Sequence, residues 1–189
     1  MSLLVISPKR FQDARGWFSE TWNESKFAEL GIKSDFCQDN QSHSGVKGTL
    51  RGLHFQAPPF AQAKLVRCLQ GRIFDVAVDI RKASPTFGKW FGLELSAENG
   101  RQLFIPAGYA HGFLTLEQDC MISYKVDAYY SSPHDGGIAW NDPAIGIEWP
   151  IDDLPVLSEK DAKLPMLAEL WVEFPYDGVP LTTPDEFIP

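Results

Sequence analysis

The chain has 189 residues, of which 44% are hydrophobic and 13% aromatic, a composition typical of one folded globular domain. Its formal net charge of -8 at pH 7 argues against non-specific nucleic-acid binding, because neutralising phosphates requires clustered Lys and Arg. No apolar run approaches the roughly 18 residues of a membrane span, so we expect neither a nucleic acid nor a membrane as partner.

The chain opens on a strand-like run, residues 1–8, without the basic leader and small-residue cleavage site of a signal peptide. We therefore expect a cytoplasmic protein. Cys37, Cys68 and Cys120 are odd in number, far apart and set in apolar or strand-like runs. This spacing predicts buried small hydrophobes and neither a disulfide nor a metal site.

Short strands dominate the middle of the chain. Residues 24–30 predict a helix, with Asn23 as N-cap and Gly31 just past its end. The run 72–80 alternates, with Phe74, Val76, Val78 and Ile80 on one face and Asp75 and Asp79 on the other. Further strands are expected at 90–95, 102–105, 112–116 and 121–126. The pattern predicts an all-β fold, a jelly-roll β-barrel with a few short helices.

Ser158 opens a second short helix, and the chain after it loses its periodicity. The segment 171–189 contains Pro175, Pro180, Pro184 and Pro189 and predicts irregular structure on the surface. We therefore divide the chain into a jelly-roll domain, 1–170, and a proline-containing tail, 171–189.

Two histidines lie in strings that resemble the signatures of the cupin superfamily. Residues 106–111 (PAGYAH) resemble the second signature, which ends on His111, and residues 52–56 (GLHFQ) resemble the first. In metal-binding members the first signature holds two histidines one residue apart, but Gln56 takes the second place here, and an amide is a poor ligand for zinc or iron. A three-histidine site would have to recruit His43 or His134 from turn-like segments. We therefore expect no metal, and His54 becomes a candidate general base.

Nine strings resemble one family, the cofactor-independent dTDP-4-dehydrorhamnose 3,5-epimerases, over about residues 7–167. The strings are 13–20 (DARGWFSE), 38–40 (QDN), 50–56 (LRGLHFQ), 64–68 (KLVRC), 74–81 (FDVAVDIR), 106–113 (PAGYAHGF), 124–125 (YK), 140–142 (WND) and 157–161 (LSEKD). The resemblance implies a cupin-type jelly roll without a cofactor. It also implies epimerisation at C3 and C5 of a dTDP-4-keto-6-deoxy sugar through an enolate, in dTDP-rhamnose synthesis.

Such a reaction needs a base on one face of the sugar, an acid on the other and a cation near the carbonyl oxygen. The resemblance assigns His54 as the base, Asp161 as the group that orients its imidazole, Tyr124 as the acid and Lys64 as the cation. An unperturbed imidazole titrates at about pH 6.5, which suits a base near neutrality.

The remaining matched residues are implied to bind the substrate. Arg15, Arg51 and Lys160 would meet the diphosphate or its surroundings, Tyr130 would stack on the thymine, and His111 would lie in the substrate pocket. Further polar contacts are implied for Glu20, Gln38, Asn40 and Asp135. Family members usually carry Glu at the position of Asp135. The family works as a homodimer whose N-terminal segments cross, so Arg15 and Glu20 are expected either in their own site or in the partner's.

Each role has an ordinary structural alternative. Asp161 follows Ser158 by three residues and fits a capping box. Tyr124 shares its strand face with Ile122 and Val126, which favours a place in the core.

Strict alternation places Arg51 and His54 on opposite faces of one strand, although both are expected in the site. Either a bulge at Gly52 or use of Arg51 across the dimer would reconcile the alternation with these roles.

Three other functions stay open at the level of sequence. One is epimerisation at a single carbon of the same substrate, which uses the same base and acid. The second is a metal-dependent cupin enzyme, against which Gln56 argues. The third is a catalytically idle sugar-nucleotide-binding module, which would not require an opposed acid and base.

Overall fold

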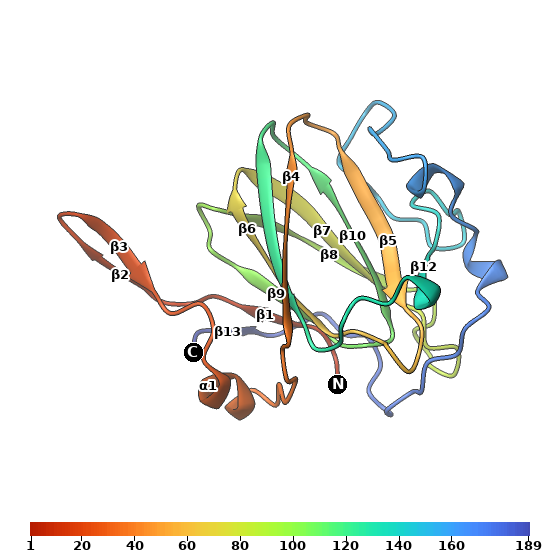
Figure 1. The fold of residues 1–189 in the computed structure, drawn as a ribbon, viewed down its shortest axis with the longest axis horizontal. Helices are drawn as coiled ribbons and strands as arrows, with labels where there is room; N and C mark the ends of the chain where they lie inside the picture. Colours follow the sequence, from red (N-terminus) through yellow and green to blue (C-terminus); the bar gives the residue numbers. More distant parts are fainter.

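The computed structural model describes residues 1–189 and contains two large sheets that face each other (Figure 1). The six-stranded sheet has the order β13-β1-β9-β6-β11-β4, and the five-stranded sheet has the order β12-β5-β10-β7-β8. The strands are β1 (Leu4–Ile6), β2 (Arg10–Asp13), β3 (Gly16–Ser19), β4 (Gln38–Ser44), β5 (Leu50–Gln56), β6 (Lys64–Gln70), β7 (Arg72–Asp79), β8 (Trp90–Ser96), β9 (Gln102–Ile105), β10 (Tyr109–Thr115), β11 (Cys120–Val126), β12 (Asp135–Gly137) and β13 (Glu186–Phe187). The helices are α1 (Glu24–Glu29) and three single 3-10 turns, η1 (Ser132–His134), η2 (Asp161–Lys163) and η3 (Leu167–Glu169).

This arrangement confirms the predicted all-β jelly roll, with one difference in closure. The two sheets stay separate and open at their edges and do not form a continuous barrel. A core lies between them, built from Val66 and Ile122 of one sheet and Ile73, Ala77 and Phe113 of the other. Because apolar side chains fill one part of the interior, the polar side chains that line the rest form a distinct cavity.

Strand β7 shows why both faces of the five-stranded sheet are buried. Ala77 faces the other sheet, whereas Val76 and Val78 belong to a second cluster on the outer face. The predicted alternation of β7 is therefore confirmed. Asp75 and Asp79 lie on the inward face and are 0% exposed, so their carboxylates need partners inside the protein.

The second cluster is completed by the C-terminal part of the chain. Leu170, Val172 and Phe174 pack onto the outer face of the five-stranded sheet and are each at most 7% exposed. Further on, β13 pairs in parallel with β1 at the edge of the six-stranded sheet. Apart from β13, the segment 171–189 is irregular and lies on the surface as predicted, but Val172 and Phe174 are exceptions that are buried against the sheet. The division of the chain at residue 170 stays a prediction.

The predicted helix 24–30 is confirmed as α1, which covers the outer face of the six-stranded sheet with Phe27. The Asn23 side chain accepts a hydrogen bond from the Lys26 backbone N–H at 3.3 Å, and Gly31 follows with a positive φ of 84°. The helix predicted after Ser158 shrinks to the 3-10 turn η2.

A two-stranded hairpin, β2–β3, projects away from both sheets (Figure 1). Phe11, Trp17 and Phe18 on this hairpin are between 54% and 69% exposed.

Cys68 and Cys120 are buried as predicted, but Cys37 is exposed, so its assignment as a buried hydrophobe is wrong. None of the helices is long and apolar enough to cross a membrane.

Candidate active site

A polar cavity opens between the two sheets and has two adjoining compartments, a larger one beside Tyr130 that we call the outer compartment and a smaller one beside His111 that we call the inner compartment. The outer one has a volume of about 290 Å³ and the inner one about 170 Å³. His54, Lys64 and Tyr124 line both compartments and mark where they meet. The outer compartment is also lined by Gln38, Asn40, Phe55, Gln56, Gln62, Tyr130, Asp135 and Lys160, and the inner one by Ser42, Arg51, His111 and Phe113. Ten of the predicted site residues therefore line one cavity. An eleventh, Asp161, does not line the cavity but contacts His54.

His54 and Asp161 form a hydrogen-bonded pair in the wall made by β5. His54 Nε2 lies 2.6 Å from Asp161 Oδ1, and the Asp161 side chain is 5% exposed. Burial raises the pKa of Asp161, but the hydrogen bond and charge of His54, helped by Ser158 and the Gly52 backbone N–H, outweigh it and lower the pKa overall. The carboxylate therefore stays ionised and can stabilise an imidazolium on His54.

Ser158 performs the capping role that the sequence allowed, but Asp161 does not complete the capping box. The Asp161 backbone N–H donates to Ser158 Oγ at 3.0 Å, as at a helix N-terminus. The Asp161 side chain nevertheless points to His54, 107 residues away in the chain. The two interpretations of Asp161 are thus compatible, because its backbone and its side chain serve different partners.

A bulge at Gly52 places Arg51 and His54 on the same face of β5. His54 pairs with His111 of β10 and Arg51 pairs with Phe113, so three steps on β5 match two on β10. Gly52 has a φ of 129°, and a Cβ there would lie 2.5 Å from the Gly112 Cα. Only glycine permits this close approach, and Arg51 therefore lines the inner compartment of its own chain.

Lys64 and Tyr124 come from the six-stranded sheet and face His54 across the cavity. The Lys64 ammonium donates to the His54 carbonyl oxygen at 3.3 Å. Burial lowers the pKa of Lys64 to about 8, while Asp75 and Asp135 oppose this shift and Lys160 adds to it. Burial raises the pKa of Tyr124, so its phenol keeps its proton at neutral pH. The cavity thus holds a histidine on one wall and a protonated tyrosine on the other.

His111 is fixed by a second buried carboxylate. His111 Nε2 lies 2.8 Å from Asp75 Oδ1, and the two side chains are 8% and 0% exposed. Burial lowers the pKa of His111, with Lys64 and His54 acting in the same direction and Asp75 against it. Asp75 is a site residue that the family resemblance did not supply, although the alternation in residues 72–80 had already placed its carboxylate on one strand face with Asp79.

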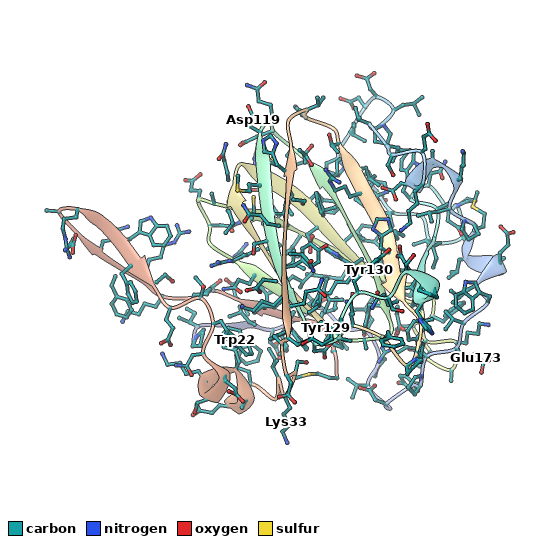
Figure 2. The ribbon with its side chains drawn as sticks, in the orientation of Figure 1. Trp22, Lys33, Asp119, Tyr129, Tyr130 and Glu173 are labelled. Carbon is teal, nitrogen blue, oxygen red and sulfur yellow. The ribbon has the colours of Figure 1, made fainter.

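The outer compartment joins Tyr130, Asp135 and Lys160 at its rim. The Tyr130 hydroxyl donates to Asp135 Oδ2 at 3.1 Å, and the Lys160 ammonium pairs with the same oxygen. Gln38 Nε2 donates to Asn40 Oδ1 at 2.8 Å on the facing strand β4. Figure 2 labels Tyr130, which precedes η1 in the chain and lines this compartment.

Gln56 stands where metal-binding cupins carry a histidine, and its amide is fully engaged with backbone. Nε2 donates to the carbonyl oxygens of Phe60 at 2.8 Å and Tyr129 at 3.2 Å, and Oε1 accepts from the Ser131 N–H at 2.6 Å. No three His, Cys, Asp or Glu side chains of the chain converge as metal ligands. His43 pairs with Asp119, and Figure 2 shows Asp119 at the end of the molecule away from Tyr130.

Arg15 and Glu20 lie outside the cavity of their own chain. Arg15 sits at the tip of the β2–β3 hairpin, 90% exposed, and pairs only with Asp13. Glu20 pairs with Lys26 of α1 at 3.0 Å. The structure therefore brings together all of the predicted site residues except these two.

A jelly roll whose cavity opposes a carboxylate-paired histidine to a protonated tyrosine, beside a buried lysine, defines the class of acid–base isomerases of small polar substrates. The family model of the dTDP-4-dehydrorhamnose 3,5-epimerases matches residues 1–169. The chain belongs to this family of isomerases.

Three relatives illustrate how close the similarity is. A dTDP-4-dehydrorhamnose 3,5-epimerase of Sinorhizobium fredii is 57% identical over 172 residues, which are 91% of this chain and 88% of the relative. The crystal structure of a dTDP-6-deoxy-D-glucose-3,5-epimerase of Legionella pneumophila, in complex with dTDP-4-keto-L-rhamnose, is 45% identical, with a TM-score of 0.87 over 92% of this chain and 94% of that one. A 3'-monoepimerase of Streptomyces bikiniensis, in complex with dTDP-quinovose, is 33% identical, with a TM-score of 0.82 over 88% and 84%.

Proposed function

We propose that the chain epimerises dTDP-4-dehydro-6-deoxy-D-glucose at C3 and C5 to dTDP-4-dehydro-L-rhamnose, in dTDP-rhamnose biosynthesis. The observation that carries the proposal is the placement of His54, with its buried Asp161, and Tyr124 on opposite walls of one cavity. The similarity is also greater to 3,5-epimerases than to the monoepimerase, which favours the double reaction over inversion of one carbon.

The reaction at each carbon is a pair of proton transfers. The His54 imidazole takes the proton from the carbon next to the C4 carbonyl, and the C–H electrons move into the carbonyl to form an enolate. The Lys64 ammonium stabilises the negative oxygen. The Tyr124 hydroxyl then returns a proton to the opposite face, which re-forms the carbonyl and inverts the carbon. Solvent removes the proton from His54 and restores the one on Tyr124. Because these steps transfer only protons, we propose that the enzyme needs no cofactor.

The division of the cavity supports an orientation for the substrate. His54, Lys64 and Tyr124 meet where the compartments join, so the sugar occupies this junction and the inner compartment, near Arg51 and His111. The nucleotide then extends into the outer compartment, where Tyr130 offers a face to the thymine. Lys160 lies on the path of the diphosphate, with Gln38, Asn40 and Asp135 as further polar contacts.

We also propose a homodimer in which the β2–β3 hairpin of each chain enters the partner's site. Its exposed Phe11, Trp17 and Phe18 would bury apolar surface on association, and Arg15 and Glu20 lack access to the cavity of their own chain. Three free cysteines fit a reducing compartment, which supports a cytoplasmic location.

The test is incubation with the 4-keto-6-deoxy sugar nucleotide in deuterium oxide, followed by NMR of the recovered sugar. We expect deuterium at both C3 and C5, together with inversion at both carbons. Deuterium at one carbon would identify a monoepimerase, and no incorporation would exclude proton abstraction altogether.

A further inference from the structure

The irregular segment 128–131 is held in place by glutamine side chains. Gln62 Nε2 donates to the Ala128 carbonyl at 2.7 Å, and Gln56 Nε2 donates to the Tyr129 carbonyl at 3.2 Å. Gln38 Oε1 accepts from the Tyr130 N–H at 3.0 Å, and Gln56 Oε1 accepts from the Ser131 N–H at 2.6 Å. Main-chain groups of four consecutive residues are thus bound by three amides.

These glutamines reach the segment from three different places. Gln38 begins β4, Gln56 ends β5 and Gln62 lies in the loop before β6. Gln56 also donates to the Phe60 carbonyl, so one side chain, 4% exposed, ties the 128–131 segment to the loop that follows β5. An amide can do this because it has both donors and acceptors, whereas a histidine or a carboxylate at residue 56 would leave buried backbone groups unpaired.

The segment carries Tyr130, a residue that is 59% exposed and whose backbone N–H is one of the four bonded groups. Hydrogen bonds to the main chain on both sides of Tyr130 fix the position of its Cα and so of the base of its side chain. At the other end of the side chain, the hydroxyl donates to Asp135. An exposed ring that is already ordered loses little conformational freedom when a ligand stacks on it.

We infer that Gln56, assisted by Gln62, is a positioning residue for nucleotide binding, because it holds Tyr130 in the geometry that receives the base. This inference rests on the proposed function, in which Tyr130 meets the thymine. It gives Gln56 a role that does not involve contact with the reacting carbons. Loss of the Gln56 amide should weaken nucleotide binding and leave the proton transfers unaffected.

The experiment compares Gln56→Glu with Gln41→Glu as a matched control, since the Gln41 amide is exposed and bonds only the Met121 sulfur. We expect Gln56→Glu to weaken binding of thymidine diphosphate, measured by calorimetry, by about tenfold and to raise KM similarly, with kcat within about twofold. In a Tyr130→Ala background the same substitution should change the affinity little, because the ring that it positions is gone. Unchanged affinity in Gln56→Glu, or a fall in kcat at constant KM, would overturn the inference.

Two further measurements keep the test decisive. If circular dichroism shows that Gln56→Glu is unfolded, Gln62→Leu removes a single bond to Ala128 at a half-buried position, and its nucleotide affinity takes the place of the first variant's. Amide hydrogen exchange of the peptide containing residues 128–131 should be faster in either variant than in Gln41→Glu. The unmodified chain separates the two proposals. If its amides at residues 128–131 exchange slowly but it does not bind the nucleotide, the glutamine contacts are present and the proposed function is wrong.

Discussion

His54 Nε2 lies 2.6 Å from Asp161 Oδ1, and the carboxylate is buried while the histidine borders the cavity. Because Asp161 bonds one ring nitrogen, the other is free to take a proton from the substrate. The pair therefore links the five-stranded sheet to the single turn η2, which would otherwise have little role in the site.

Replacing Asp161 by Asn should lower kcat/KM by about 100-fold or more, since the imidazolium loses its counter-charge while the shape is kept. Steady-state kinetics with the 4-keto sugar nucleotide provides the measurement, and the exposed Asp153 mutated to Asn is the control. Near-normal activity in Asp161→Asn would mean that the charge of the carboxylate does not support the base.

Replacing Tyr124 by Phe should separate proton abstraction from inversion. His54 would still remove the proton, but the opposite face would have no acid, so the carbon regains hydrogen from the side on which it was lost. We expect deuterium incorporation without net inversion, observed by NMR in deuterium oxide. Inversion at the normal rate would show that another group supplies the proton.

The buried Lys64 predicts an alkaline limit to activity. Its pKa is lowered to about 8, so the ammonium is lost as the pH rises through that value, and kcat/KM should fall with it. Unfolding does not explain such a fall, because the unfolded chain binds the proton more tightly and this group makes the fold more stable as the pH rises. Lys64→Arg should remove this fall of kcat/KM at alkaline pH, since a guanidinium group stays charged there. If kcat/KM of Lys64→Arg still falls at alkaline pH, a group other than Lys64 is responsible for the fall.

The bulge at Gly52 can be tested through stability. Gly52→Ala combines a φ of 129° with a Cβ placed 2.5 Å from the Gly112 backbone, so we expect a loss of about 3 kcal/mol or more in unfolding free energy. Gly178 also has a positive φ, 84°, but open space around its Cβ, and Gly178→Ala should cost only about 1 kcal/mol. Urea denaturation measures both variants. Equal losses would mean that the close contact with β10 contributes nothing.

The proposed homodimer, in which the β2–β3 hairpin of each chain enters the partner's site, predicts complementation between inactive chains. Arg15→Ala and His54→Ala should each abolish activity alone. In a mixed dimer, however, one cavity combines an intact His54 with an intact hairpin from the partner. Refolding the two variants together in equal amounts should restore about a quarter of normal activity, if the chains mix at random. No recovery in mixed dimers verified by mass spectrometry would place Arg15 in its own chain's site.

Local pattern predicted the elements of this fold well. Asn23 and Gly31 marked the ends of α1, and the alternation in residues 72–80 predicted β7, because caps and face periodicity depend only on neighbours in the chain. The site residues came from the family resemblance, and all but Arg15 and Glu20 fall together in the structure. The burial of Val172 and Phe174 was not predictable, because the surface that they cover belongs to β7 and β10.

The sequence by itself determined the strands, the helix caps and the residue types available for acid–base chemistry. Only the tertiary structure decided which face of β5 Arg51 shares with His54, because the bulge depends on how closely Gly52 approaches Gly112 of another strand. It also decided that Asp161 serves His54 as well as its own turn, and that Gln56 joins two loops. A side chain's role is fixed by its partners, and these partners are distant in the chain, so they become neighbours only when the two sheets pack face to face.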